Sequence, residues 1–193
     1  MSDRERSAAA ARDGWIALVC WGIHAAVHVQ RGSAADLVWG CNVGALLIAV
    51  GLVARERSLV STGTFWLAAG TPLWLMDLVF GGERLCSSLL VHIVVLALGV
   101  RALVRDGLVE GAFWRALLGG ALLQQCTRWL THWSVNINVS YGIYAPFRRW
   151  FSDYSRYWLF TFVYVGALYF AFERLLRWHR ARSQRATQPA TAP

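Results

Sequence analysis

The feature that most constrains this chain is a series of apolar runs, each close to the length of a membrane span. The hydrocarbon core of a bilayer requires about 20 apolar residues per helix. A chain that is 56% hydrophobic and only 16% charged supplies such runs repeatedly. The pattern predicts an all-α, polytopic membrane bundle of six transmembrane helices. The predicted spans are Gly14–Val29, Asp36–Ala54, Ser58–Phe80, Leu85–Val104, Phe113–Trp133 and Tyr154–Trp178.

The first predicted span is the shortest and has a second interpretation. A basic start followed by a short apolar stretch is typical of a signal peptide, and the letters GSAA after Arg31 form a weak cleavage site. His24 and His28 interrupt the apolar stretch, and 13 residues precede it. These features favour a retained helix.

The basic charge of the chain is arranged as a membrane topology predicts. All 19 basic residues are Arg, and the formal net charge is +8. With the N-terminus inside, most of them fall in segments that face the cytoplasm, so the positive-inside rule predicts cytoplasmic N- and C-termini. The outer segments hold only Arg31, Arg84, Arg148, Arg149 and Arg156.

Topology and attraction to anionic lipid therefore account for the charge, and nucleic acid is not an expected partner. A composition without Lys and rich in Ala, Leu, Arg and Gly is typical of GC-rich genomes. We therefore expect a multi-pass protein of the inner (plasma) membrane of a bacterium.

The two ends of the chain differ from its middle. Residues 1–13 and 179–193 are polar and rich in Ala, Arg, Ser, Thr and Pro, so they are expected to be disordered cytoplasmic segments. They flank a transmembrane domain at residues 14–178. Most of its loops are short, and the exception, Ser134–Asp153, is long enough to suggest a functional role.

Polar side chains inside predicted spans are costly in lipid, so they are the first candidates for function. Cys41, Asp77 and His92 approach the same membrane surface from the outer ends of their spans, and His92 is the deepest of the three. A thiol becomes nucleophilic when a base removes its proton, and a carboxylate can orient that base. This set predicts Cys41 as nucleophile, His92 as base and Asp77 as orienter. The alternative is that Cys41 packs against a neighbouring helix while Asn42 forms an interhelical hydrogen bond.

Other polar residues near the outer surface are candidates for binding a substrate. Gln124, Arg128 and His132 are four residues apart on the fifth predicted span and would form one polar stripe. An Asp77–Arg128 ion pair is a structural alternative for both charges. The residues assigned to substrate binding are Asn42, Arg128, His132, Asn136 and Asn138.

The histidines also permit a metal or haem site. Cys20, His24 and His28 are four residues apart and share one face of the first predicted span, a spacing that metal sites use. Two axial imidazoles for haem could come from His24, His28, His92 and His132, although no haem signature accompanies them. The four Cys residues show neither a CxxC pair nor disulfide spacing, so we assign no metal, disulfide or cofactor.

The order of these features resembles the YwaF-like bacterial integral-membrane family and its eukaryotic transmembrane acyltransferase relatives. The matching pieces, spread over residues 36 to 178, are Cys41-Asn42, Gly70-Thr71-Pro72 with Asp77, His92, and the letters NINVSYG from Asn136 to Gly142. The resemblance implies about six helices and a catalytic cysteine and histidine that act on glycerophospholipid acyl chains. It assigns these roles to Cys41 and His92. The androgen-induced membrane hydrolases are similar in layout but use Thr and His.

Three functions are compatible with these residues. The first is a lipid acyltransferase or hydrolase with a Cys41–His92 dyad, in a polar pocket open to the outer leaflet and with membrane lipid as its partner. The second is a non-catalytic binding or transport module, or a subunit that associates with itself or with another membrane protein. The third is the histidine metal or haem site.

Overall fold

The computed structural model describes residues 3–80 and 85–187, and every regular element in these two ranges is helical. The helix from Cys86 to Asp106 contains α4 (Cys86–Leu89), a π-helical turn (Leu90–Val95) and α5 (Leu96–Asp106). The other long helices are α1 (Asp3–Gln30), α2 (Gly40–Ala54), α3 (Arg57–Val79), α6 (Ala112–Leu130) and α7 (Tyr154–Thr187). Short 3-10 helices lie in the connections, at Ala34–Val38, Trp133–Val135, Ile137–Val139 and Ala145–Phe147.

Each predicted span corresponds to one of these helices, and the all-helical prediction is confirmed for the described residues. α2 begins at Gly40 rather than at Asp36, because Asp36 lies in a 3-10 turn whose carbonyl accepts a hydrogen bond from Trp39 N. α1 begins at Asp3 and α7 continues to Thr187, into segments expected to be disordered. Ala and Arg, frequent in both segments, have high helix propensity. Residues 1–2 and 188–193 of these segments lie outside the described residues.

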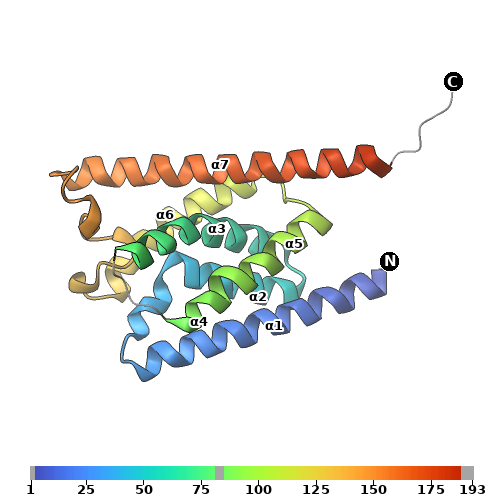
Figure 1. The fold of residues 1–193 in the computed structure, drawn as a ribbon, viewed down its shortest axis with the longest axis horizontal. Helices are drawn as coiled ribbons and strands as arrows, with labels where there is room; N and C mark the ends of the chain where they lie inside the picture. Colours follow the sequence, from blue (N-terminus) through green and yellow to red (C-terminus); the bar gives the residue numbers. More distant parts are fainter. Residues whose placement is uncertain (1–2, 81–84, 188–193) are drawn as a thin grey trace.

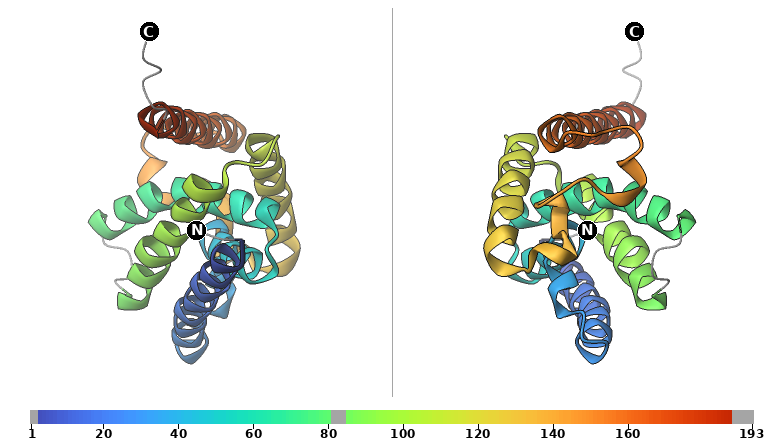
Figure 2. Two further views of the ribbon diagram at one scale, coloured as in Figure 1. Left: turned by 90° about the vertical axis from the view of Figure 1, so that its right-hand side faces the viewer. Right: turned by 90° about the vertical axis from the view of Figure 1, so that its left-hand side faces the viewer.

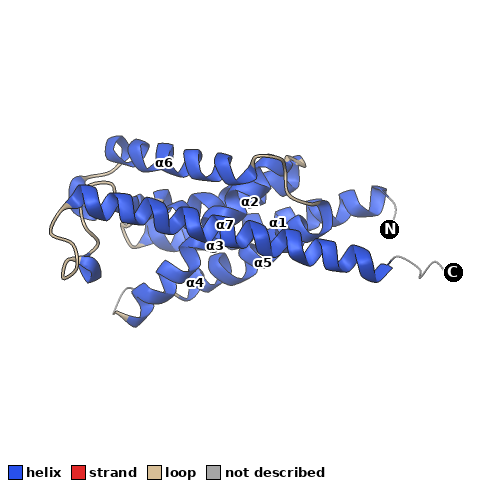
Figure 3. Cartoon of the chain, turned by 90° about the horizontal axis from the view of Figure 1, so that it is seen from above, coloured by secondary structure: helices blue, strands red, loops and turns tan. Residues whose placement is uncertain are grey.

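Successive long helices run in alternating directions along the long axis of the molecule (Figures 1 and 3). The start of α1 and the end of α7 therefore lie at one end of the bundle (Figure 1). The opposite end carries the connections at residues 31–39 and 131–153, and we call it the loop end. α1 and α7 lie on opposite sides of the bundle, with α2 and α3 between them (Figure 2).

Glycines bring α2 and α3 into close contact. A Cβ atom at Gly63 would stand only 2.4 Å from the carbonyl oxygen of Gly44 and 2.9 Å from Ile48 N. A Cβ atom at Gly51 would stand 2.8 Å from Val60 N. Residues without side chains allow two helix backbones to approach each other this closely. The α2–α3 crossing therefore depends on these glycines.

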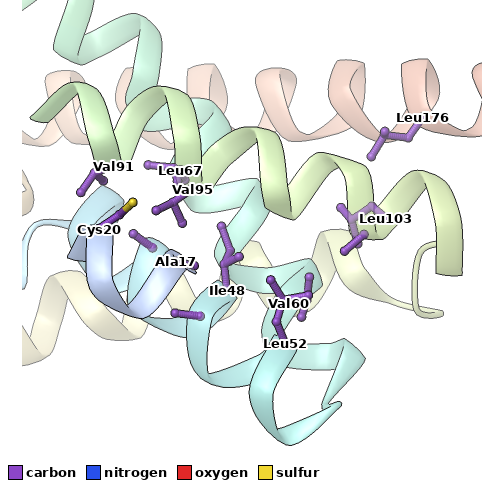
Figure 4. Close-up of a cluster of buried hydrophobic side chains, with 13 residues drawn as sticks. Ala17, Cys20, Ile48, Leu52, Val60, Leu67, Val91, Val95, Leu103 and Leu176 are labelled. Atoms are coloured by element: carbon purple, nitrogen blue, oxygen red, sulfur yellow. The ribbon is translucent and has the colours of Figure 1, made fainter. Parts of the chain in front are cut away.

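Two clusters of buried apolar side chains hold the helices together. The first joins α1, α2, α3, the helix from Cys86 to Asp106 and Leu176 of α7, and it includes Ala17, Ile48, Leu67 and Val91 (Figure 4). The second joins α3, α6 and α7 around Phe65. Side chains of both α3 and α7 therefore belong to the two clusters, and these helices connect one cluster to the other.

Large apolar side chains are exposed on the outward faces of several helices. They include Trp15, Val19 and Ile23 on α1, Trp114, Leu118 and Leu122 on α6, and Leu159, Val163 and Phe170 on α7. The helices Cys86–Asp106 and Tyr154–Arg182 are long and apolar enough to cross a membrane, and Gly40–Ala54 is a shorter apolar helix. Only 11% of the most apolar stretch of α7 is buried, so α7 presents its apolar side chains mainly to its surroundings.

Candidate functional site

A half-enclosed cavity of about 580 Å³ lies toward the loop end of the bundle. Its wall comes from the C-terminal parts of α1 and α3, the N-terminal parts of α2, α4 and α7, the middle of α6, and the loop between α6 and α7. Most of the wall is aromatic or aliphatic, and the volume is within the range of about 300–1,000 Å³ that small-molecule sites occupy. Its ionisable and amide side chains are those of His24, His28, Asp36, Cys41, Asn42, Asp77, His92, Gln124, Asn138 and four tyrosines.

The cavity collects most of the residues assigned from the sequence, although these come from four separate segments of the chain. Those that line it are Cys41, Asn42, Asp77, His92 and Asn138. Arg128, His132 and Asn136 do not line it. His132 follows the end of α6 and is exposed.

His92 is held in place by α3. It lies in the π-helical turn Leu90–Val95 and is 4% exposed. Its Nδ1 is 3.2 Å from Thr71 Oγ1, and its ring stacks on Trp74 with 4.5 Å between ring centroids. π-helical turns are rare and occur frequently at functional sites. Thr71 and Trp74 together determine the position and the tilt of the imidazole.

Thr71 also determines which ring nitrogen of His92 carries the proton. The Thr71 hydroxyl donates its hydrogen to Leu67 O, one turn earlier in α3, at 2.8 Å. Because a hydroxyl has a single hydrogen, its oxygen must accept the hydrogen bond from His92 Nδ1–H. Nε2 is then the unprotonated nitrogen, as a general base requires.

Cys41 packs against the residue next to Thr71. A Cβ atom at Gly70 would stand 2.9 Å from Cys41 Cβ, so the missing side chain of Gly70 makes room for Cys41. The Cys41 Sγ lies 4.0 Å from Asn42 Oδ1. Within the described residues, no hydrogen bond joins Cys41 to His92. The two side chains therefore converge on the Gly70–Thr71 turn of α3 without a direct hydrogen bond.

Asn42 links the start of α2 to the neighbouring segments. Its Nδ2 donates to Asp36 O at 2.8 Å, and its backbone carbonyl accepts from Trp21 Nε1 of α1 at 2.9 Å. The residue is 4% exposed. These bonds hold Asn42 beside the thiol, and its carboxamide also interacts with His24.

Asp77 pairs with a tyrosine of the long loop. Tyr144 donates its hydroxyl to Asp77 Oδ1. Burial, followed by this hydrogen bond, raises the pKa of Tyr144 above its ordinary value of 10.0, so the phenol stays protonated and remains a donor. Asp77 was predicted to orient His92. In the structure Thr71 takes this place, and its hydroxyl lies at hydrogen-bond distance from His92 Nδ1.

The Asp77–Arg128 ion pair, considered as a structural alternative for both charges, does not form between these two described residues. Arg128 Nε donates to Ser140 O at 2.6 Å, and its guanidinium lies 5.9 Å from the centre of the Tyr154 ring. Arg128 therefore holds the loop that follows α6, and the predicted stripe of Gln124, Arg128 and His132 does not face the cavity as a unit. Gln124 alone lines the cavity.

Asn138 fastens the long loop to α2 and α6. Its Oδ1 accepts from Gly40 N at 2.7 Å, and its Nδ2 donates to Val38 O at 2.8 Å and to Thr127 Oγ1 at 3.0 Å. Its φ of 53° lies in the left-handed region, which Asn tolerates better than most residues. All hydrogen-bonding groups of this side chain are therefore engaged within the protein.

Asn136 has a similar role within the loop. Its Oδ1 accepts from Tyr141 N and Gly142 N, both at 2.9 Å, and its Nδ2 donates to Gly142 O at 3.1 Å. Asn136, Asn138 and Arg128 were assigned to substrate binding from the sequence. In the structure their polar atoms hold residues 131–153 in place over the cavity.

The remaining histidines of the cavity are bonded to hydroxyl groups. His24 Nδ1 lies 3.0 Å from Ser87 Oγ, and His28 Nδ1 lies 2.8 Å from Ser33 Oγ and 3.6 Å from Asp36 Oδ2. Among the described residues, no group of three or more His, Cys, Asp or Glu side chains is arranged to hold a metal ion. Of the four histidines considered as haem ligands, His24, His28 and His92 line the cavity and His132 does not.

Three residues of the site did not stand out in the sequence. Thr71, Trp74 and Tyr144 position the histidine or the carboxylate, yet each is of a type common in membrane spans and their boundaries. The one available signal for Thr71 was its place in the Gly-Thr-Pro segment. Tyr144 could not be paired with Asp77 in advance, since 67 residues separate them.

Comparison with known proteins adds no relative. No family model, no curated protein and no solved structure matches this chain. The resemblance to the YwaF-like family therefore stays a prediction based on short motifs, and function has to be argued from the geometry of the cavity.

Proposed function

We propose that the chain is a multi-pass protein of the bacterial inner membrane, with six transmembrane helices and both termini in the cytoplasm. The support comes from the apolar outward faces of α1, α6 and α7, from the two helices long enough to span, and from the distribution of Arg. In a bilayer these faces contact lipid chains. In this orientation the loop end and the cavity belong to the outer leaflet.

We further propose that the cavity binds the acyl chain of a membrane lipid and that Cys41 accepts the acyl group, with His92 as base. The observation that carries this proposal is the convergence of Cys41 and His92 on Gly70–Thr71, in the wall of a largely apolar cavity. The apolar wall suits an acyl chain. The tautomer selected by Thr71 leaves Nε2 of His92 to take up the thiol proton.

The proposed reaction is thioester formation from an acyl ester. After rotation of the Cys41 side chain about its Cα–Cβ bond, His92 Nε2 takes the thiol proton and the sulfur attacks the ester carbonyl. The carbon–oxygen bond of the ester breaks, the alcohol leaves with the proton returned by His92, and the acyl group remains on Cys41. Water or a second alcohol then accepts the acyl group. Asn42, which lies beside the thiol, is the proposed donor to the oxyanion.

This reaction is the one that the family resemblance implies. Kinship with the YwaF-like family is itself part of the proposal. Thr71 joins Cys41 and His92 as a third residue of the proposed site. Thr71 belongs to the Gly-Thr-Pro segment that the resemblance rests on, and here it holds the base. The same cavity could also serve a non-catalytic binding role. An acylation experiment distinguishes this role from acyl transfer.

Cys41→Ala is expected to abolish acyl transfer onto the protein. The purified full chain is incubated with a lauroyl ester, and the acylated peptide is identified by mass spectrometry and by its cleavage with hydroxylamine. Wild-type protein should carry the acyl group on Cys41. His92→Ala should lower the rate of acylation about 100-fold, because the thiol then lacks its base.

The other cysteines provide the control for this experiment. Cys86 and Cys126 are exposed free thiols. The Cys126→Ala variant should be acylated on Cys41 at the wild-type rate. Acylation found only on Cys86 or Cys126, or ester turnover unchanged in Cys41→Ala, would rule out Cys41 as the nucleophile. Binding of the ester without any acylation would leave the cavity a binding site and reject the chemistry.

Thr71→Val is expected to slow acylation of Cys41 about tenfold, because the isosteric side chain cannot hold His92 Nδ1–H. Thr71→Ser retains a hydroxyl and should restore most of the rate. The two variants have the same expected effect on the fold, since the residue is only partly buried in α3. Equal rates in Thr71→Val and Thr71→Ser would show that the hydroxyl does not position the base.

A further inference from the structure

The cavity has a charge balance opposite to that of the whole chain. The chain carries a formal net charge of +8, and every basic residue other than His is Arg. Among the described residues that line the cavity, none is Arg, whereas Asp36 and Asp77 both are lining residues. Asp36 lies 3.6 Å from His28 Nδ1. Asp77 is therefore the acidic group of this wall that is left without a basic neighbour in the described part of the chain.

The partner of Asp77 is a neutral group. The Tyr144 hydroxyl donates to Asp77 Oδ1, and burial keeps this phenol protonated. A neutral donor orients a carboxylate but does not neutralise it. A half-buried carboxylate inside an apolar wall is costly unless a cation accompanies it. The ligand of the cavity can supply that cation.

Aromatic rings surround the same corner of the cavity. Phe147 packs against Tyr144 at 6.4 Å, against Tyr157 at 5.7 Å and against Phe160 at 6.1 Å between ring centroids. All four of these residues line the cavity. The faces of aromatic rings attract ammonium groups, most strongly where water is excluded. A carboxylate and several rings at one place form a site suited to an organic cation.

We propose that the cavity selects amphiphiles with an ammonium head group, which lies beside Asp77 among the rings of Tyr144, Phe147, Tyr157 and Phe160. The inference rests on the proposed function, since it specifies the head group of the same ligand. An anionic head group placed there meets a carboxylate and, among the described residues of the cavity wall, no guanidinium. Both a primary ammonium and a quaternary ammonium have the required charge.

Binding of four dodecyl compounds tests this inference. The full chain, purified in neutral maltoside micelles, is titrated with dodecylammonium, dodecyltrimethylammonium, dodecanoate and uncharged dodecanol, and binding is followed by tryptophan fluorescence. Both ammonium compounds are expected to bind about tenfold more tightly than dodecanoate. Asp77→Asn, which keeps an acceptor for Tyr144, should reduce this preference to about twofold or less.

Two further variants make the result specific. Asp153→Asn removes an exposed carboxylate from the loop between α6 and α7. Asp153 does not line the cavity, so this variant should preserve the preference for ammonium compounds over dodecanoate. Phe147→Leu should weaken binding of dodecyltrimethylammonium more than binding of dodecylammonium. Only the primary ammonium can also donate hydrogen bonds to Asp77, so it depends less on the aromatic ring. The relative losses in Asp77→Asn and Phe147→Leu thus show which kind of ammonium the site prefers.

The outcomes separate the head-group inference from the proposed function. If wild-type protein binds dodecanoate as tightly as the ammonium compounds, the inference is wrong while binding of an amphiphile stands. It is also wrong if Asp77→Asn and Asp153→Asn change the preference equally. If none of the four compounds binds, dodecanol included, the proposed function itself fails.

Discussion

Gly63→Leu is expected to prevent the chain from folding into a stable bundle. A Cβ atom at Gly63 meets the carbonyl oxygen of Gly44 at 2.4 Å and the backbone nitrogen of Ile48 at 2.9 Å. Backbone atoms cannot turn aside as a flexible side chain can, so α2 and α3 must separate. The expected loss of unfolding free energy is about 3 kcal/mol or more. Unfolding of the purified variant in detergent, followed by circular dichroism, measures this loss.

Gly22→Ala is the matched control for the α2–α3 contact. Gly22 lies in α1, and no atom stands within 4 Å of a Cβ built there. Alanine has the higher helix propensity, so this variant should be unchanged or more stable by about 0.5–1 kcal/mol. If Gly63→Leu is as stable as Gly22→Ala, the close approach of α2 and α3 does not support the bundle.

Asn138→Ala is expected to release the long loop and to destabilise the loop end of the bundle. The alanine side chain can no longer accept from Gly40 N or donate to Val38 O and Thr127 Oγ1. A buried polar group that loses its partner costs about 1–3 kcal/mol, so the sum over these groups is expected to reach about 3 kcal/mol. Because Ala also fits a φ of 53° poorly, the backbone adds to the loss.

Limited digestion with trypsin detects the released loop. Arg148 and Arg149 are exposed in this loop, and the folded loop should protect them from rapid cleavage. Asn138→Ala is expected to be cleaved there at least several times faster than the wild type. Gln125→Ala removes an exposed carboxamide from α6 and should be cleaved at the wild-type rate. Equal cleavage of the two variants would show that Asn138 does not fasten the loop.

The helices could be predicted because they depend on local pattern. The apolar runs and their polar boundaries place α3 within one residue of its predicted limits and the start of α7 at Tyr154. The start of α2 could not be placed as well, because Asp36 takes part in a 3-10 turn that depends on contacts with Asn42. Helical structure at residues 3–13 and 179–187 was missed because polar composition was interpreted as disorder.

The site could be predicted only in part. The free-energy cost of a polar side chain within a predicted membrane span was enough to select Cys41, Asp77 and His92. All three line one cavity. The same criterion also selected Arg128, whose guanidinium bonds to the loop at Ser140 O. Asn138, assigned because it lies just outside the spans, bonds from the loop to α2 and α6 instead. The free-energy cost of an unpaired polar group in lipid indicates that the group has a partner but does not identify the partner. Whether that partner is a ligand or the backbone of residues 131–153 depends on how distant segments meet.

The sequence by itself determined the class of the protein, namely a helical chain with six apolar segments, an asymmetric distribution of Arg and a few polar groups within the apolar segments. These properties depend on composition and on spacing along the chain. Only the tertiary structure decided that Gly70 and Thr71 bring Cys41 and His92 to one turn of α3, and that Asp77 meets Tyr144 rather than Arg128. Such pairings depend on the packing of helices that are distant in sequence, and periodicity within a single helix carries no information about them.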